Sequence, residues 1–166
     1  MYIEDKYWNN YIGDTDDSLT LAAYLADKNK EEISVGEIFS DIGLDKLNGD
    51  FRKHDDPLTA VCSNVDSDYE EPYVEFYYAI DLVTDLAALL LECAVNGSVS
   101  LGELLDNGNE NAIRITFTDE EKAAMNKALA DFVQDPLAYD LHEMVPDEDM
   151  QQMARDCENL RKELCE

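Results

Sequence analysis

The sequence predicts one α+β domain, mainly helical, with a small antiparallel sheet packed on a central apolar helix. Three observations predict this class. Residues 78–95 are almost continuously apolar, residues 118–133 and 146–166 repeat apolar positions at helical spacing, and only short β-branched or aromatic runs interrupt them. At 166 residues and 45% hydrophobic content, the chain is long enough for one sizeable core. We therefore treat residues 1–166 as a single domain.

The first half of the chain contains two expected helices with side chains that can cap them. Residues 14–18 offer several caps before a helix that reaches about Lys28. Ser34 and Glu37 fit a capping box, in which each side chain accepts a hydrogen bond from the other residue's amide. This box predicts a short helix that ends near Gly43.

Three segments are expected to form the sheet. Residues 58–62 and 73–78 are rich in β-branched and aromatic side chains, and the polar residues 63–72 between them predict a hairpin. Residues 112–117 alternate apolar and polar side chains, as a half-buried strand does. We expect the three strands to form one antiparallel sheet against the 78–95 helix.

The central helix is expected to end at Gly97, because a residue just after a helix often takes a left-handed conformation that suits glycine. At the helical period, Asp81, Asp85 and Glu92 fall on one narrow stripe, while apolar residues cover nearly all the rest. This pattern predicts a helix packed on most sides, with the acids at its solvent edge.

The C-terminal part is predicted to be helical. Thr118 and Glu121 form another capping box before a helix to about Val133, and residues 137–144 are expected to form a short helix. A last helix follows Pro146, with acidic residues near its start. Its apolar residues form one stripe that should face the core.

Two further features leave alternatives open. Residues 34–43 and 100–108 share a Ser-x-Gly-Glu opening, which indicates either an internal repeat or the recurrence of a capping box. Residues 1–13 are rich in tyrosine and contain the single tryptophan, Trp8. This segment either folds over the core or contacts a partner, since Trp and Tyr are frequent in binding hot spots.

The charge of the chain excludes some partners. Thirty-nine Asp and Glu stand against 12 Lys and Arg, for a net charge of -27. Such a surface repels nucleic acid and anionic membranes, so we expect neither as a partner. A basic protein or a cation is its natural complement.

The acids are concentrated in the middle of the chain. No lysine or arginine occurs between Lys53 and Arg114, and unopposed carboxylates can attract a basic partner. The alternative is an ordinary solvated surface. The acids expected to bind the partner are Asp66, Asp68, Glu70, Glu71, Asp81, Asp85, Glu92, Glu103 and Asp106.

Catalysis is not expected. The chain contains no H-E-x-x-H motif, nucleophile elbow or glycine-rich phosphate loop, and His54 and His142 are isolated in the sequence. We expect no cofactor and no metal. The N-terminus has no basic segment followed by an apolar one, and the cysteines have no C-x-x-C spacing, so we expect a cytoplasmic protein.

Residues 64–75 allow an alternative function. They place oxygen-bearing side chains at several positions of a calcium-loop register, although Tyr69 occupies the position where such loops have glycine. A calcium or other cation-binding module is therefore the alternative to a protein-binding role.

In its single domain, its charge of -27 and its acidic residues around 66–71 and 81–92, the chain resembles the small acidic immunity proteins of bacteria. These proteins neutralise polymorphic or contact-dependent toxins. The resemblance implies a non-catalytic inhibitor that covers a basic toxin domain, with carboxylates facing the lysines and arginines that would hold the toxin's substrate. The resemblance is to the general type and rests on no residue-by-residue motif.

Overall fold

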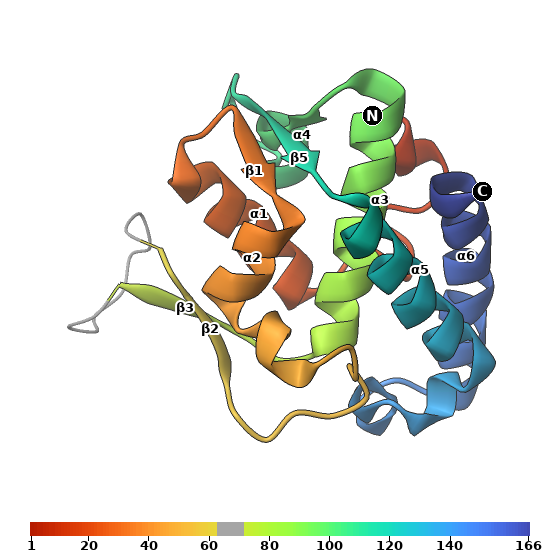
Figure 1. Cartoon of the computed structure of the whole chain (residues 1–166). Helices are drawn as coiled ribbons and strands as arrows, with labels where there is room; N and C mark the ends of the chain where they lie inside the picture. Colours follow the sequence, from red (N-terminus) through yellow and green to blue (C-terminus); the bar gives the residue numbers. More distant parts are fainter. Residues whose placement is uncertain (63–71) are drawn as a thin grey trace.

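The helix α3 (Ala79–Asn96) runs through the centre of the protein in the computed structural model (Figure 1). The structure describes residues 1–62 and 72–166. Every residue of α3 from Ala79 to Glu92 is buried, and the helix ends at Gly97 with a φ of 86°. The prediction of a central apolar helix closed by a left-handed glycine is confirmed.

The other helices lie on two sides of α3 (Figure 1). They are α1 (Asp16–Lys28), α2 (Val35–Ile42), α4 (Leu101–Leu105), α5 (Asp119–Gln134) and α6 (Asp147–Cys165). α5 and α6 pack against each other and against α3, and α1 contacts α3 from the opposite side. The fold class is α+β, as predicted.

The strands form two separate sheets. The strands are β1 (Glu32–Ser34), β2 (Leu58–Val61), β3 (Tyr73–Phe76), β4 (Val99–Ser100) and β5 (Ala112–Thr116). β2 and β3 form the predicted antiparallel hairpin, with Leu58 opposite Phe76. β5 does not join them: it lies between β1, to which it is parallel, and β4, to which it is antiparallel.

The prediction of one antiparallel sheet is therefore wrong. The partners of β5 are only three and two residues long, too short to show the alternation that marks a strand. Each runs directly into a helix whose N-cap is a serine, Ser34 for α2 and Ser100 for α4. The sequence therefore indicated only the starts of α2 and α4, whereas in the structure a short strand leads directly into each of these helices.

The serine caps are present, but only one half of each expected box forms. The Glu37 amide donates to Ser34 Oγ at 3.1 Å, whereas the Glu37 carboxylate binds Lys30 Nζ at 2.7 Å. At the start of α5 both halves form, because the Glu121 carboxylate also accepts from the Thr118 amide at 2.9 Å. The two Ser-x-Gly-Glu segments thus share a cap but not a full box.

The glycine that the two segments share is required by a different neighbour in each segment. A Cβ on Gly36 would lie 2.8 Å from Oε1 of Glu121, and a Cβ on Gly102 would clash with the backbone oxygen of Asn109. β4 also pairs with the strand that follows it, β5, whereas β1 does not pair with β2. These differences favour a recurring cap over an internal repeat.

The connection between α5 and α6 is not one short helix, as expected for residues 137–144. It consists of two 3-10 segments, η3 (Pro136–Ala138) and η4 (Asp140–Glu143), separated by Tyr139 in an extended conformation. The Tyr139 ring packs edge-on against Phe132 at a centroid distance of 5.0 Å. The two 3-10 segments lie at the lower end of the α5–α6 pair in Figure 1.

The N-terminal aromatic segment belongs to the core. Ile3, Tyr7, Trp8 and Ile12 are buried, and Ile3 begins the short helix η1 (Ile3–Asp5). The Tyr7 hydroxyl donates to the Glu163 carboxylate of α6 at 2.6 Å. Of the two alternatives, the structure supports the segment as a cover of the core.

Candidate partner-binding surface

The acids of α3 lie inside the protein and not at a solvent edge. Asp81 is 3% exposed, Asp85 1% and Glu92 2%. The expectation of an exposed acidic stripe is therefore wrong, and the N-terminal segment and α1 contact Asp85 and Glu92 on this side of the helix. These three residues therefore offer no surface to a partner in this structure.

Asp85 and Glu92 instead accept hydrogen bonds from the chain that covers them. Asp85 accepts from the Gly13 amide at 3.0 Å and from Ser18 Oγ at 2.6 Å. Glu92 accepts from the Ile3 amide at 3.0 Å. Backbone amides that would otherwise be buried without an acceptor are thereby satisfied, so these carboxylates position residues 1–18 on α3.

The buried carboxyls near the start of α3 have raised pKa values. Burial, together with the charges of Asp85, Asp17 and Asp140, raises the pKa of Asp81 to about 8. Burial also raises the pKa of Asp85 to about 7, although its hydrogen bonds from Ser18 and Gly13 act in the opposite direction.

Asp17 of α1 is a third buried acid near the start of α3. Its carboxylate accepts hydrogen bonds from the amides of Tyr77 and Tyr78, both at 2.9 Å, and burial raises its pKa as well. Desolvation thus outweighs hydrogen bonding at Asp85 and Asp17.

The remaining acids of the expected binding surface fall into two groups, one outside the described residues and one exposed to solvent. Asp66, Asp68, Glu70 and Glu71 lie outside the described residues, as does most of the 64–75 calcium register, whose end forms β3. Glu103 and Asp106 are exposed on and just after α4, where Asp106 ends the helix with a φ of 50°. Glu103 lies 3.6 Å from the N-terminal ammonium group. Of the described acids in the predicted set, these two face solvent.

Most of the cationic side chains are already paired within the chain. Those within 4.0 Å of a carboxylate are Lys6, Lys28, Lys30, Arg52, Lys127, Arg161 and Lys162. Lys28 and Lys30 bind Asp41 and Glu37 at 2.6 and 2.7 Å. The excess of 39 acids over 12 bases therefore leaves most acids without an intramolecular counter-charge.

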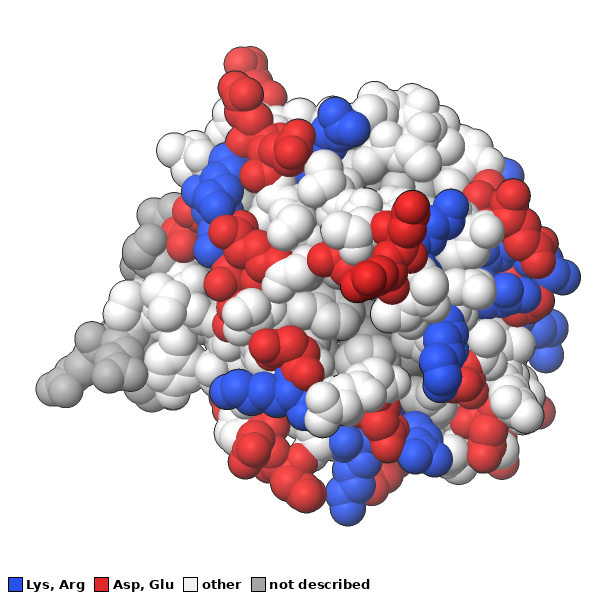
Figure 2. Space-filling model, viewed as in Figure 1, with Lys and Arg blue, Asp and Glu red and all other residues white. Residues whose placement is uncertain are grey.

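On the face that Figure 2 shows, the acids do not form one unbroken patch. Figure 2 shows acidic and basic side chains interspersed on one face, with an uncharged area between α2 and α5. The expectation of a contiguous negative surface does not hold for this face. Charge surrounds an apolar depression there.

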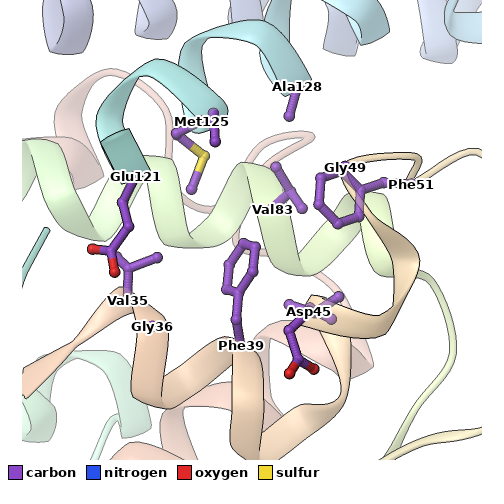
Figure 3. A pocket seen from close by; sticks show the side chains of 12 residues that line it. Val35, Gly36, Phe39, Asp45, Gly49, Phe51, Val83, Glu121, Met125 and Ala128 are labelled. Carbon is purple, nitrogen blue, oxygen red and sulfur yellow. The ribbon is translucent and has the colours of Figure 1, made fainter. Parts of the chain in front are cut away.

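This depression is a pocket of about 220 Å³ between α2, α5 and the loop that follows η2 (Leu44–Leu47). Figure 3 shows Phe39 of α2, Val83 of α3, Met125 of α5 and Phe51 pointing toward one another around it. Val83, Met125 and Phe51 are buried, and Phe39 is half-buried. The pocket could not be predicted from the sequence, because its lining comes from three distant segments and the apolar residues of each have the pattern of ordinary core residues.

Acidic and small residues form the rim. Gly36, Asp45, Gly49 and Ala124 are exposed at the mouth, and Glu121 is half-buried beside Gly36. The Oε2 atom of Glu121 accepts from the Thr118 amide, while Oε1 faces the α2 backbone at Gly36. Figure 3 places Glu121 and Asp45 at different ends of the pocket.

A comparison with known families identifies the type of protein. A family model described as Immunity protein 68 matches residues 2–164, which is almost the whole chain. The chain belongs to this family. No curated protein and no solved structure gives a significant match.

Membership of the Immunity protein 68 family confirms the resemblance to toxin-immunity proteins that the sequence indicated. It points to neutralisation of a toxin as the role of the chain, and immunity proteins are generally non-catalytic. Among the described residues, no three His, Cys, Asp or Glu side chains are placed to hold a metal ion. None of the described helices combines the length and apolar character needed to cross a bilayer.

Proposed function

We propose that this member of the Immunity protein 68 family neutralises a toxin by binding a positively charged surface of the toxin domain, without catalysis of its own. The observation that carries the proposal is the net charge of -27, together with the pairing of most lysines and arginines inside the chain. A partner rich in lysine and arginine would be attracted over a long range and would meet few repelling charges.

The proposed mechanism is occlusion. A toxin that acts on an anionic substrate must hold it with cationic side chains, and carboxylates can occupy the same positions. Glu103 and Asp106 are the described acids of the predicted set that remain available for this contact. Asp66, Asp68, Glu70 and Glu71 stay in the proposed surface as sequence-based expectations.

The proposal predicts a binding constant that depends on salt. We expect the cognate toxin domain to bind this chain, and the dissociation constant of the complex to rise about tenfold or more between 50 and 500 mM NaCl, since salt screens exposed charges. Isothermal titration calorimetry at several salt concentrations measures this. Absence of binding at 50 mM NaCl would contradict the proposed function, and a salt-independent constant would contradict its electrostatic basis.

Neutralising Glu103 and Asp106 together tests the proposed surface. We expect the double variant Glu103→Gln, Asp106→Asn to bind the toxin domain about tenfold more weakly. The control is Asp56→Asn, Glu148→Gln, which removes the same charge from two exposed acids elsewhere. Equal losses would show that only the net charge matters and that α4 is not part of the contact.

A further inference from the structure

We propose that the pocket between α2 and α5 receives an apolar side chain of the toxin that is flanked by lysine or arginine. The inference rests on the proposed function and assigns it a specific contact. An apolar centre surrounded by charged residues is the usual arrangement of a protein interface, in which one buried side chain supplies much of the affinity.

The interior of the pocket suits an apolar occupant. Its deep residues Val83, Met125 and Phe51 belong to the core, and Phe39 and Ala124 extend the apolar surface toward solvent. A cavity of about 220 Å³ can hold one leucine or phenylalanine side chain. Burying such a side chain there would remove its apolar surface from water, which favours binding.

The charge at the mouth selects the neighbours of that side chain. Glu121 and Asp45 lie at different ends of the pocket. Among the described residues that line the pocket, none is a lysine or an arginine. A cation on either side of the inserted residue would meet a carboxylate, whereas an acidic flank would be repelled.

The same charge argues against a second copy of this chain as the occupant. Two copies would bring net charges of -27 together, and the repulsion would oppose association at low salt. The glycines at the mouth, Gly36 and Gly49, also leave the α2 backbone and the adjacent loop accessible to a side chain from a partner. Charge complementarity therefore favours the basic toxin domain.

Filling the mouth of the pocket tests the proposal directly. Ala124 is exposed on α5 and lines the pocket, while its neighbour Ala123 is exposed on the same helix but does not line it. We expect Ala124→Phe to weaken binding of the toxin domain about 30-fold, which corresponds to the loss of one hot-spot residue. The matched control Ala123→Phe introduces the same residue into the same helix and should bind as the unmodified chain does.

The acidic rim has its own matched pair. Glu121→Gln removes the charge and keeps an oxygen that can accept from the Thr118 amide, and Glu120→Gln removes a neighbouring exposed charge outside the pocket. We expect about a fivefold weaker complex for Glu121→Gln and a smaller change for Glu120→Gln. Equal effects of the two variants would remove the rim from the proposal.

A titration without toxin separates this inference from the proposed function. Three peptides serve as probes for NMR of the labelled full chain: Gly-Lys-Leu-Lys-Gly, Gly-Lys-Ser-Lys-Gly and Gly-Glu-Leu-Glu-Gly. The first should shift the amide resonances of Gly36, Ala124 and Met125 at millimolar concentration, and the other two should not. No shift with the first peptide, or equal shifts with all three, would overturn the proposal.

The outcomes are distinguishable. If the unmodified chain does not bind the toxin domain, the proposed function fails. The peptide titration then shows by itself whether the pocket binds an apolar side chain flanked by lysine. If it binds and Ala124→Phe binds equally well, the function stands and the pocket is not its contact. Sedimentation that shows a dimer of the unmodified chain, lost in Ala124→Phe, would assign the pocket to a second copy and overturn the inference.

Discussion

Replacing Gly13 with alanine is expected to lower the free energy of unfolding by about 3 kcal/mol. Gly13 has a φ of +80°, a conformation that costs alanine about 1 kcal/mol. A Cβ at this position would also clash with the ring of Trp8, which is 6% exposed and packed in the core. The backbone cannot move away easily, because the Gly13 amide donates to buried Asp85 at 3.0 Å.

Gly97 provides the matched control for this substitution. Its φ is +86°, but a Cβ there would meet nothing within 4 Å. Gly97→Ala should therefore lose only the conformational part, about 1 kcal/mol, and both substitutions restrict the unfolded chain equally. Chemical denaturation of the three proteins measures the difference, and equal losses at the two positions would contradict the packing of Trp8 on Gly13.

Trp8 reports on the same contact independently. It is the only tryptophan of the chain, so its fluorescence describes the N-terminal segment alone. In Gly13→Ala we expect the emission maximum to move to longer wavelength, because the displaced ring becomes exposed to water. In Gly97→Ala the emission should not change.

The elements that the sequence predicted well are those specified by local chemistry. Thr118 and Glu121 cap α5 through their own side chains and amides, and Gly97 ends α3 through its own φ. Ser34 and Ser100 likewise mark the starts of α2 and α4. Each of these signals needs only a few neighbouring residues, so it can be detected without knowing the fold.

What the sequence did not show depends on contacts between distant segments. The pairing of β5 with two- and three-residue strands has no local pattern, and the pocket joins residues near 35–51, 83 and 121–128. The acids of α3 are the clearest case. A polar stripe on a buried helix can face water or can accept hydrogen bonds from another segment, and periodicity does not distinguish the two.

In this protein the N-terminal segment supplies the hydrogen-bond donors for Asp85 and Glu92 of α3. Its amides at Ile3 and Gly13 require acceptors once its aromatic side chains enter the core, and Glu92 and Asp85 supply them. The unbalanced charge in the middle of the chain therefore has two origins. Some of its acids are internal acceptors, and the surface acids that remain are the ones available to a toxin.

Asp81 leads to the second large expected effect, a stability that depends on pH through a buried acid. Its pKa is raised from 3.8 to about 8 in the folded protein, chiefly by burial and then by the charges of Asp85, Asp17 and Asp140. Its place in the first turn of α3 favours the anion by at most about 2 kcal/mol, less than the desolvation opposes it. The folded state therefore holds a proton that the unfolded chain releases near pH 4.

The sign of the effect follows from proton binding. Between about pH 4 and pH 8 the folded state binds more protons than the unfolded state, so the contribution of Asp81 to stability is complete below pH 4 and is lost as the pH rises through 8. Asp85, with a pKa of about 7, acts in the same direction. Acidification from pH 8 to pH 5 should thus stabilise this protein.

Asp81→Asn separates this acid from the general relief of charge repulsion, which also accompanies acidification of a chain with a net charge of -27. Asparagine is neutral at every pH, so the variant should match the parent only below about pH 4. Its advantage in the free energy of unfolding should grow by about 4 kcal/mol between pH 5 and pH 8, since each pH unit between the two pKa values of Asp81 changes stability by about 1.4 kcal/mol. Urea denaturation at both pH values measures the difference. Asp106→Asn, which neutralises an exposed acid, should show no such change with pH, and a constant difference between Asp81→Asn and the parent would show that Asp81 is not protonated in the folded protein.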